Sequence, residues 1–108
     1  HRIMIVEGIF DAIAALLQCP EYTPVAVLGS SISDYQMNFI RTYAGYVKEV
    51  RIWMDETKIS KKIADLVKAK IDYCPIEIIK STGKDPEEIM NDRMSKGYPL
   101  QWIFSNYK

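Results

Sequence analysis

The sequence predicts an α/β protein in which helices cover both faces of a four-stranded, mainly parallel sheet. Short apolar runs alternate with stretches of helical periodicity along the chain, and each pair is typical of a strand followed by a helix. The connections between these stretches are short, as in doubly wound sheets. The 108 residues are 48% hydrophobic, which suffices for one compact domain. Because an apolar run begins almost at once, we expect residues 1–108 to be one domain of a larger protein.

The first strand and helix are expected over residues 2–18. Arg2–Val6 is apolar without alternation after its first residue, which suits a strand covered on both faces. Glu7 and Gly8 end this strand. Helical spacing then predicts a helix over Phe10–Gln18, which Pro20 stops. The side chains expected to pack this helix form an aliphatic stripe: Ile9, Ala12, Ile13, Leu16 and Leu17.

Two further strand and helix pairs follow. Val25–Leu28 is expected to be a strand, and the next helix begins at a cap formed by Ser33 or Asp34. Aromatic residues line one face of that helix: Tyr35, Phe39 and Tyr43. Val50–Met54 predicts the third strand. Large apolar residues at helical spacing mark the helix after it: Ile59, Ile63, Leu66, Val67 and Ile71.

The last pair begins with Ile76–Ile79, where Glu77 favours an edge or partly exposed strand. Asp85 followed by Pro86 is a strong helix start, with an acidic cap and proline at the first helical position. Beyond this helix, the segment 99–108 carries large apolar residues that have to pack somewhere: Leu100, Trp102, Ile103 and Phe104. They can pack either on this domain or on a neighbouring one.

Composition excludes several classes of function. The 14 basic and 14 acidic residues cancel, so any contact with DNA or an anionic surface has to come from local patches. The longest apolar run, Ala12 to Leu17, is far shorter than the roughly 20 residues of a membrane-spanning helix. Cys19 and Cys74 are isolated, and His1 is the single histidine, which excludes zinc fingers and histidine-dependent triads within the chain. We expect both thiols to be reduced, as in a cytoplasmic protein.

Acidic residues gather where the predicted strands end. In parallel sheets the carboxyl ends of the strands form one edge, and ligands bind there. The convergence of these acids depends on the order of the strands. If the first, third and fourth strands are neighbours and the second lies outside the first, this edge brings together Glu7, Asp55 and Asp85. Asp11 adds an acid one helical turn after Glu7. Carboxylates without histidine or thiolate select Mg²⁺ or Mn²⁺, and such ions serve phosphoryl transfer.

Helix capping is an alternative explanation for some of these acids. Acidic residues are common at helix N-termini, and capping alone would account for Asp34 and Asp85. Glu7 is harder to explain in this way because it lies between a buried strand and a glycine turn.

Four elements, in this order and spacing, resemble the Toprim domain of bacterial and phage DNA primases. They are residues 6–12 (Val-Glu-Gly-Ile-Phe-Asp-Ala), 28–30 (Leu-Gly-Ser), 52–55 (Ile-Trp-Met-Asp) and 83–87 (Gly-Lys-Asp-Pro-Glu). The last element favours the primase branch. The resemblance implies a Rossmann-like fold that binds Mg²⁺ or Mn²⁺ and joins ribonucleotides into primers on a DNA template. It also implies other primase domains or a replicative helicase as partners.

On the matching positions, the resemblance implies that Glu7 is the principal catalytic acid and Asp55 a catalytic metal ligand. Asp11, Asp85 and Glu87 would be supporting metal ligands, while Gly29 and Ser30 would form a turn that approaches the nucleotide closely. The sequence departs from the family where a second acid usually follows Asp55 by two residues, because Thr57 stands there. A neutral hydroxyl is a weak ligand, so we expect lower metal affinity unless Glu56 or Glu87 compensates.

Basic and aromatic residues are candidates for contact with nucleic acid. We expect Lys84 on the acidic edge, which makes it the better candidate for binding phosphate. The third helix carries an excess of lysines that can either follow a nucleic-acid backbone or simply face solvent: Lys58, Lys61, Lys62, Lys68 and Lys70. Aromatic residues at helix or strand spacing are expected in the core rather than as base-stacking platforms: Tyr35, Tyr43, Tyr46 and Trp53.

Three functions remain open at this point. The first is the Toprim domain of a primase, inactive or nearly so in isolation. The second is a Toprim nuclease or a topoisomerase-like domain. The third is a non-catalytic module for binding nucleic acid or protein, which Thr57 and the apolar tail favour.

Overall fold

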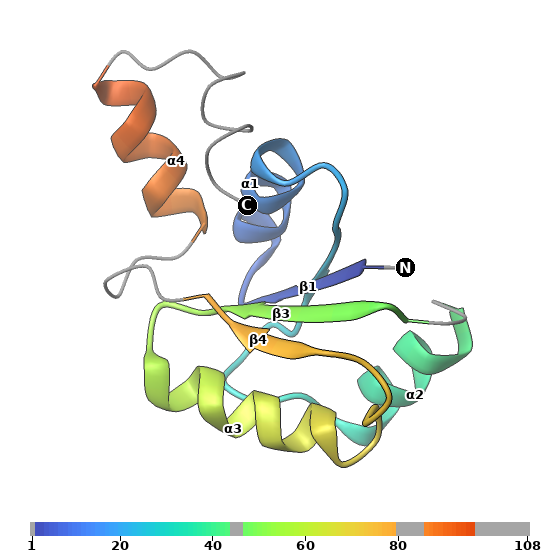
Figure 1. Cartoon of the computed structure of the whole chain (residues 1–108). Helices are drawn as coiled ribbons and strands as arrows, with labels where there is room; N and C mark the ends of the chain where they lie inside the picture. The colour runs from blue at the N-terminus through green and yellow to red at the C-terminus, as the bar shows by residue number, and fades with distance from the viewer. Residues whose placement is uncertain (1, 44–46, 80–85, 97–108) are drawn as a thin grey trace.

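The computed structural model of the chain describes residues 2–43, 47–79 and 86–96. Within these ranges, four helices flank a parallel sheet of four strands, with α1 and α4 on one side and α2 and α3 on the other (Figure 1). In chain order the elements are β1 (Arg2–Val6), α1 (Ile9–Gln18), β2 (Thr23–Ala26), α2 (Asp34–Tyr43), β3 (Glu49–Trp53), α3 (Thr57–Lys68), β4 (Ile76–Ile78) and α4 (Pro86–Ser95). The predicted α/β class with a parallel sheet is therefore confirmed.

The strands lie in the order β2-β1-β3-β4. β1 is central and pairs in parallel with both β2 and β3, so Val6 lies opposite Ala26 on one side and Trp53 on the other. β4 pairs in parallel with β3 and forms one edge of the sheet. This is the strand order that the convergence of the acidic residues required.

The predicted bounds of the second strand were wrong. β2 begins at Thr23 and ends at Ala26, because Leu28 has a φ of 60° and leaves the extended conformation. Pro24 lies within β2, opposite Met4. A proline is tolerated there because β2 is an edge strand, where one side of the backbone needs no partner.

The core lies on both faces of the sheet, which explains why β1 is apolar at every position after Arg2. Ile3 and Ile5 belong to the cluster that also contains buried residues of α2 and α3. Met4 and Val6 point to the opposite face and pack with Trp53 and Ala15. Alternate side chains of a strand face opposite ways, so a strand covered on both faces needs apolar residues throughout. Trp53 is fully buried, as expected.

The packing face predicted for α1 was wrong. The aliphatic residues of the expected stripe are mostly on the outside, with Ile9, Ile13 and Leu16 exposed by 62%, 49% and 47%. The buried face consists instead of Asp11, Ala14, Ala15 and Gln18. Small alanines let the helix axis lie close to the sheet. The helix is apolar around most of its circumference, so periodicity alone could not choose between its faces.

The face predicted for α2 was also wrong. Tyr35 and Phe39 are 79% and 54% exposed, whereas Met37 and Ile40 are buried. The cap was correct at Ser33: its Oγ accepts a hydrogen bond from the Gln36 amide, and the Gln36 side chain accepts one from the Ser33 amide. This reciprocal pair is a capping box. The side chain of Tyr43 and all of Tyr46 lie outside the described residues.

α3 packs largely as its periodicity predicted. Ile63 and Val67 are buried, as is Ile71 just beyond the helix, whereas Leu66 is 39% exposed. Both cysteines lie in described segments, and both are free thiols. Among the described residues, no helix combines the length and apolar character needed to cross a membrane.

Candidate functional site

The carboxyl ends of β1 and β3 place two acidic residues on neighbouring strands. Glu7 directly follows Val6, Asp55 comes two residues after Trp53, and Val6 and Trp53 are paired in the sheet. Both acidic residues are half-buried. We refer to the edge formed by residues 7–8, 27–30 and 55–57 as the acidic rim.

The segment after β2 runs beside Glu7 on the acidic rim. The amide of Val27 donates to the carbonyl of Val6 over 3.0 Å, and the amide of Leu28 donates to the carbonyl of Glu7 over 2.7 Å. Gly29 and Ser30 follow immediately. Apart from its two chain neighbours, no atom of the described residues lies within 4 Å of a Cβ built on Gly29, so this part of the structure leaves space beside the glycine. The fold thus brings Gly29 and Ser30 to the same edge as Glu7.

Asp11 connects the acidic rim to α4. Its side chain is only 7% exposed, and its Oδ1 accepts a hydrogen bond of 3.2 Å from the backbone amide of Glu87. A Cβ on Gly8 would lie 3.8 Å from the other carboxylate oxygen of Asp11, so that oxygen faces the turn after Glu7. The carboxylate lies in the first turn of α1 and binds the first turn of α4, where both helix dipoles favour negative charge.

Gln18 makes a second connection between α1 and α4. Its side-chain nitrogen donates to the carbonyl of Ala14 over 3.1 Å and to the carbonyl of Pro86 over 3.0 Å. The side chain is fully buried. Asp11 and Gln18 lie two helical turns apart on the buried face of α1, and together they fix where α4 begins. No sequence signal assigned this role to Gln18.

The remaining predicted site residues differ in position. Glu87 is half-buried in the first turn of α4, next to Asp11. Thr57 is the first residue of α3 and is exposed, so the position of the missing second acid lies at a helix N-terminus. The lysines of α3 are all exposed: Lys58, Lys61, Lys62 and Lys68. Lys84 and Asp85 lie outside the described residues.

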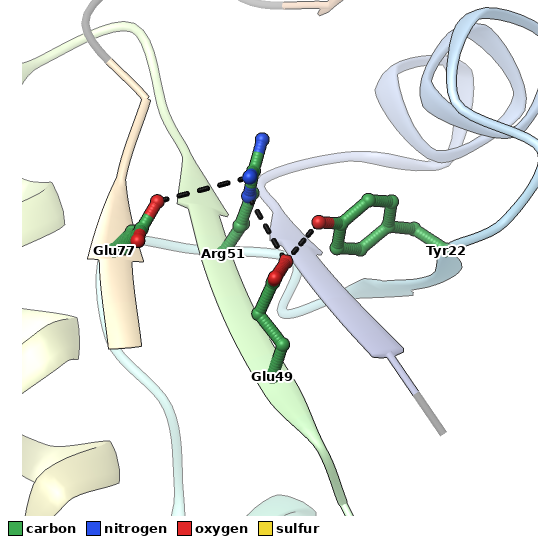
Figure 2. Close-up of polar contacts among 4 residues, drawn as sticks. All are labelled: Tyr22, Glu49, Arg51 and Glu77. Atoms are coloured by element: carbon green, nitrogen blue, oxygen red, sulfur yellow. Dashed lines mark hydrogen bonds and ion pairs between the residues drawn. The ribbon is translucent and has the colours of Figure 1, made fainter. Parts of the chain in front are cut away.

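A cluster of polar residues lies elsewhere on the sheet, in the amino-terminal half of β3 (Figure 2). Arg51 donates to Glu49 over 3.1 Å, lies 3.8 Å from Glu77, and its guanidinium is 5.3 Å from the centre of the Tyr22 ring. Glu49 also accepts a hydrogen bond from Tyr22. Sequence reasoning missed this cluster, although the i, i+2 spacing of Glu49 and Arg51 places both on one face of β3.

The polar groups of this cluster bind one another and so stabilise the fold. Burial, helped by the hydrogen bond to Glu49, raises the pKa of Tyr22 above its ordinary value. Burial, helped by the charge of Glu49, also raises the pKa of Cys74, so this thiol stays protonated near neutral pH. Arg51 is held between two carboxylates and so is poorly suited to bind a phosphate.

Comparison with known proteins agrees with this geometry. A family model described as Toprim-like matches residues 4–90, which include the acidic rim and the start of α4. The chain belongs to the Toprim-like family. A Toprim domain is a metal-binding domain of enzymes that act on nucleic acids. No curated protein and no solved structure matches the chain.

The metal expected of a Toprim domain can be tested against the donors on the acidic rim. No group of three or more acidic, histidine or cysteine side chains gathers tightly enough for a metal cage within the described ranges, which leave out Asp85. Mg²⁺ does not need such a cage, since it keeps several waters and is commonly held by one or two carboxylates plus substrate phosphates. Glu7 and Asp55, which follow paired strands, supply two carboxylates, and this is the type of donor that Mg²⁺ prefers.

Proposed function

We propose that this Toprim domain is the catalytic domain of a DNA primase, which synthesises RNA primers on a DNA template. The observation that carries the proposal is the position of Glu7 and Asp55 at the carboxyl ends of two paired strands in a Toprim-like chain. The primase branch is supported by the sequence element at residues 83–87, whose Pro86 and Glu87 begin the helix that Asp11 holds.

The residues of the domain have distinct parts in this reaction. Glu7 and Asp55 would hold Mg²⁺, which when bound neutralises the charge that develops on the reacting phosphate. Asp11 positions the N-terminus of α4 and so keeps Glu87 next to the acidic rim. The open space beside Gly29 lets a nucleotide phosphate approach the backbone. Lys58 begins the row of exposed lysines that leads away from the acidic rim and can follow the template backbone.

Primer synthesis by the full-length protein tests the proposal. Glu7→Gln keeps the size of the side chain and removes its charge, so we expect primer synthesis to fall by roughly 10²–10³-fold. Asp55→Asn should have a similar effect. The matched controls are Glu21→Gln and Asp72→Asn, which lie before β2 and before β4 at the opposite end of the sheet. These controls should retain activity.

The outcomes separate the alternatives. Metal-dependent cleavage of DNA without primer synthesis would assign the domain to a Toprim nuclease instead. Full activity of Glu7→Gln would contradict a catalytic rim. Thr57, in place of the second acid, favours a third possibility, a domain that has kept the fold and binds nucleic acid without catalysis. If the domain is not catalytic, neither Glu7→Gln nor Thr57→Asp should change any activity of the full-length protein. If the acidic rim is catalytic, Thr57→Asp should instead tighten metal binding.

A further inference from the structure

The outer face of α1 is apolar and exposed. Five large apolar residues are 42% to 70% exposed: Ile9, Phe10, Ile13, Leu16 and Leu17. At 100° per residue they fall within one arc of the helix, opposite the arc of the buried residues Asp11, Ala14, Ala15 and Gln18. We call these five residues the outer face of α1. Contiguous apolar patches of this kind on a protein surface mark places where another segment or molecule binds.

We propose that the C-terminal segment of this chain, residues 97–108, packs against the outer face of α1. The segment supplies Leu100, Trp102, Ile103 and Phe104 close together. It contains no acidic residue and only one basic residue, so charge does not oppose burial of its apolar side chains.

The geometry of α4 places the start of this segment within reach. The first turn of α4 is fixed to α1, since the amide of Glu87 lies 3.2 Å from Asp11. α4 has 10 residues. A helix of this size is about 15 Å long, so Lys96 lies within roughly 20 Å of α1. Leu100 and Phe104 follow four and eight residues later in the sequence, and an extended chain of these lengths spans at most about 13 Å and 26 Å. The apolar residues of the segment can therefore cover the outer face of α1.

Tethering favours this segment over a second copy of the chain. A segment joined to α4 by a few residues has an effective concentration near α1 in the millimolar range. A second copy has to reach the same face by diffusion and has to lose its own freedom of motion. Contact of the outer face of α1 with the segment of the same chain is therefore favoured over contact with a second copy.

Tryptophan fluorescence tests the proposal directly. The chain has two tryptophans, and Trp53 is fully buried, so Trp53→Phe leaves Trp102 as the single reporter. We expect blue-shifted emission from Trp102, which Leu16→Asp shifts to the red. Leu66→Asp is the matched control, because Leu66 is also partly exposed and also lies two residues before the end of its helix. This control should not shift the emission.

A second measurement avoids dependence on the Trp53 variant. In the otherwise unchanged chain, Trp102→Ser should increase hydrogen exchange in α1 and not in α3. The proposal is overturned if Trp102 emits as a solvent-exposed tryptophan and Leu16→Asp does not change this emission. It is equally overturned if Trp102→Ser leaves hydrogen exchange in α1 unchanged. It is also overturned if the blue shift appears only at concentrations where sedimentation shows a dimer, since the outer face of α1 then binds a second copy.

Discussion

Leu28 has a backbone conformation that costs free energy. Its φ of 60° lies in the left-handed region, where the Cβ of a leucine is crowded, and its side chain is 68% exposed. The residue gains little from burial, yet its amide binds the carbonyl of Glu7. Strain of this kind concentrates at functional sites, where the surrounding structure enforces it. At Leu28 it turns the chain away from β2 and places Gly29 and Ser30 on the acidic rim.

Replacing Leu28 should relieve this strain. Glycine adopts a positive φ without penalty but gains more entropy in the unfolded chain, so Leu28→Gly should be neutral or stabilise the protein by up to about 1 kcal/mol. Leu66→Gly, in the regular helix α3, should instead destabilise it by about 1 kcal/mol. Urea unfolding of both variants measures the difference. A loss at Leu28 equal to that at Leu66 would show that the positive φ carries no strain.

Tyr22 should make stability depend on alkaline pH. Its pKa is raised in the folded protein, chiefly by burial, whereas the unfolded chain has the ordinary value of about 10. Tyr22 therefore holds its proton more tightly in the folded state than in the unfolded state. The resulting contribution of Tyr22 to the free energy of unfolding is fully present below about pH 10 and declines above that pH. The free energy of unfolding should fall by about 1.4 kcal/mol per pH unit in that range.

The Tyr22→Phe variant isolates this effect. It should lose the steep decline between pH 10 and 11, and Tyr35→Phe, which changes an exposed tyrosine, should retain it. Denaturant midpoints measured at each pH provide the check. A decline in Tyr22→Phe as steep as that of the unmodified chain would assign it to other groups.

At the scale of elements, α4 is attached chiefly to another helix rather than to the sheet. α4 packs mainly on α1, and the two side chains that fix its start are Asp11 and Gln18. One of its residues, Ile89, enters the core beside Trp53. We expect a helix that packs outside the sheet in this way to open more readily than the central strands. Any contact between Glu87 and the acidic rim therefore depends on Asp11.

Asp11→Ala should loosen α4 selectively. The substitution removes a charged acceptor from the amide of Glu87, at a cost of about 1.5–3 kcal/mol. Hydrogen exchange in α4 should accelerate accordingly, while exchange in β1 and β3 changes less. Asp65→Ala, at an exposed position on α3, is the control and should leave α4 unchanged. Equal acceleration in α4 and in the central strands would mean that α4 unfolds only with the whole domain.

The elements also differ in how well their packing could be predicted. α3 has charged residues on one side and apolar residues on the other, so its buried face was predicted correctly apart from Leu66. α1 and α2 each present two alternative faces: alanines compete with larger aliphatic residues in α1, and Met37 and Ile40 compete with Tyr35 and Phe39 in α2. Side-chain size favoured the wrong face in both cases. The fit to the sheet decided the buried face of α2, whereas the fit to the sheet and to α4 decided that of α1.

For the whole molecule, the acidic rim should couple metal binding to stability. A metal that binds only the folded state stabilises it by about 1.4 kcal/mol at ten times its dissociation constant, which raises the melting temperature by roughly 6–10 °C in a domain of this size. We expect this rise with Mg²⁺ or Mn²⁺, and we expect EDTA to reverse it. The double variant Glu7→Gln/Asp55→Asn should show no rise. A similar rise in that double variant would place the metal elsewhere.

The sequence alone determined the α/β class, the order of the elements and the identity of the acids at the strand ends. Apolar runs, turn residues and helix caps act locally, and their spacing is visible along the chain. Tertiary structure decided which faces of α1 and α2 are buried, that Asp11 and Gln18 hold α4, and that Arg51 is bound by two carboxylates. These outcomes depend on contacts between residues far apart in sequence, such as the 76 positions that separate Asp11 from Glu87. No local pattern encodes such a contact, because it forms only when the sheet has brought the two helices together.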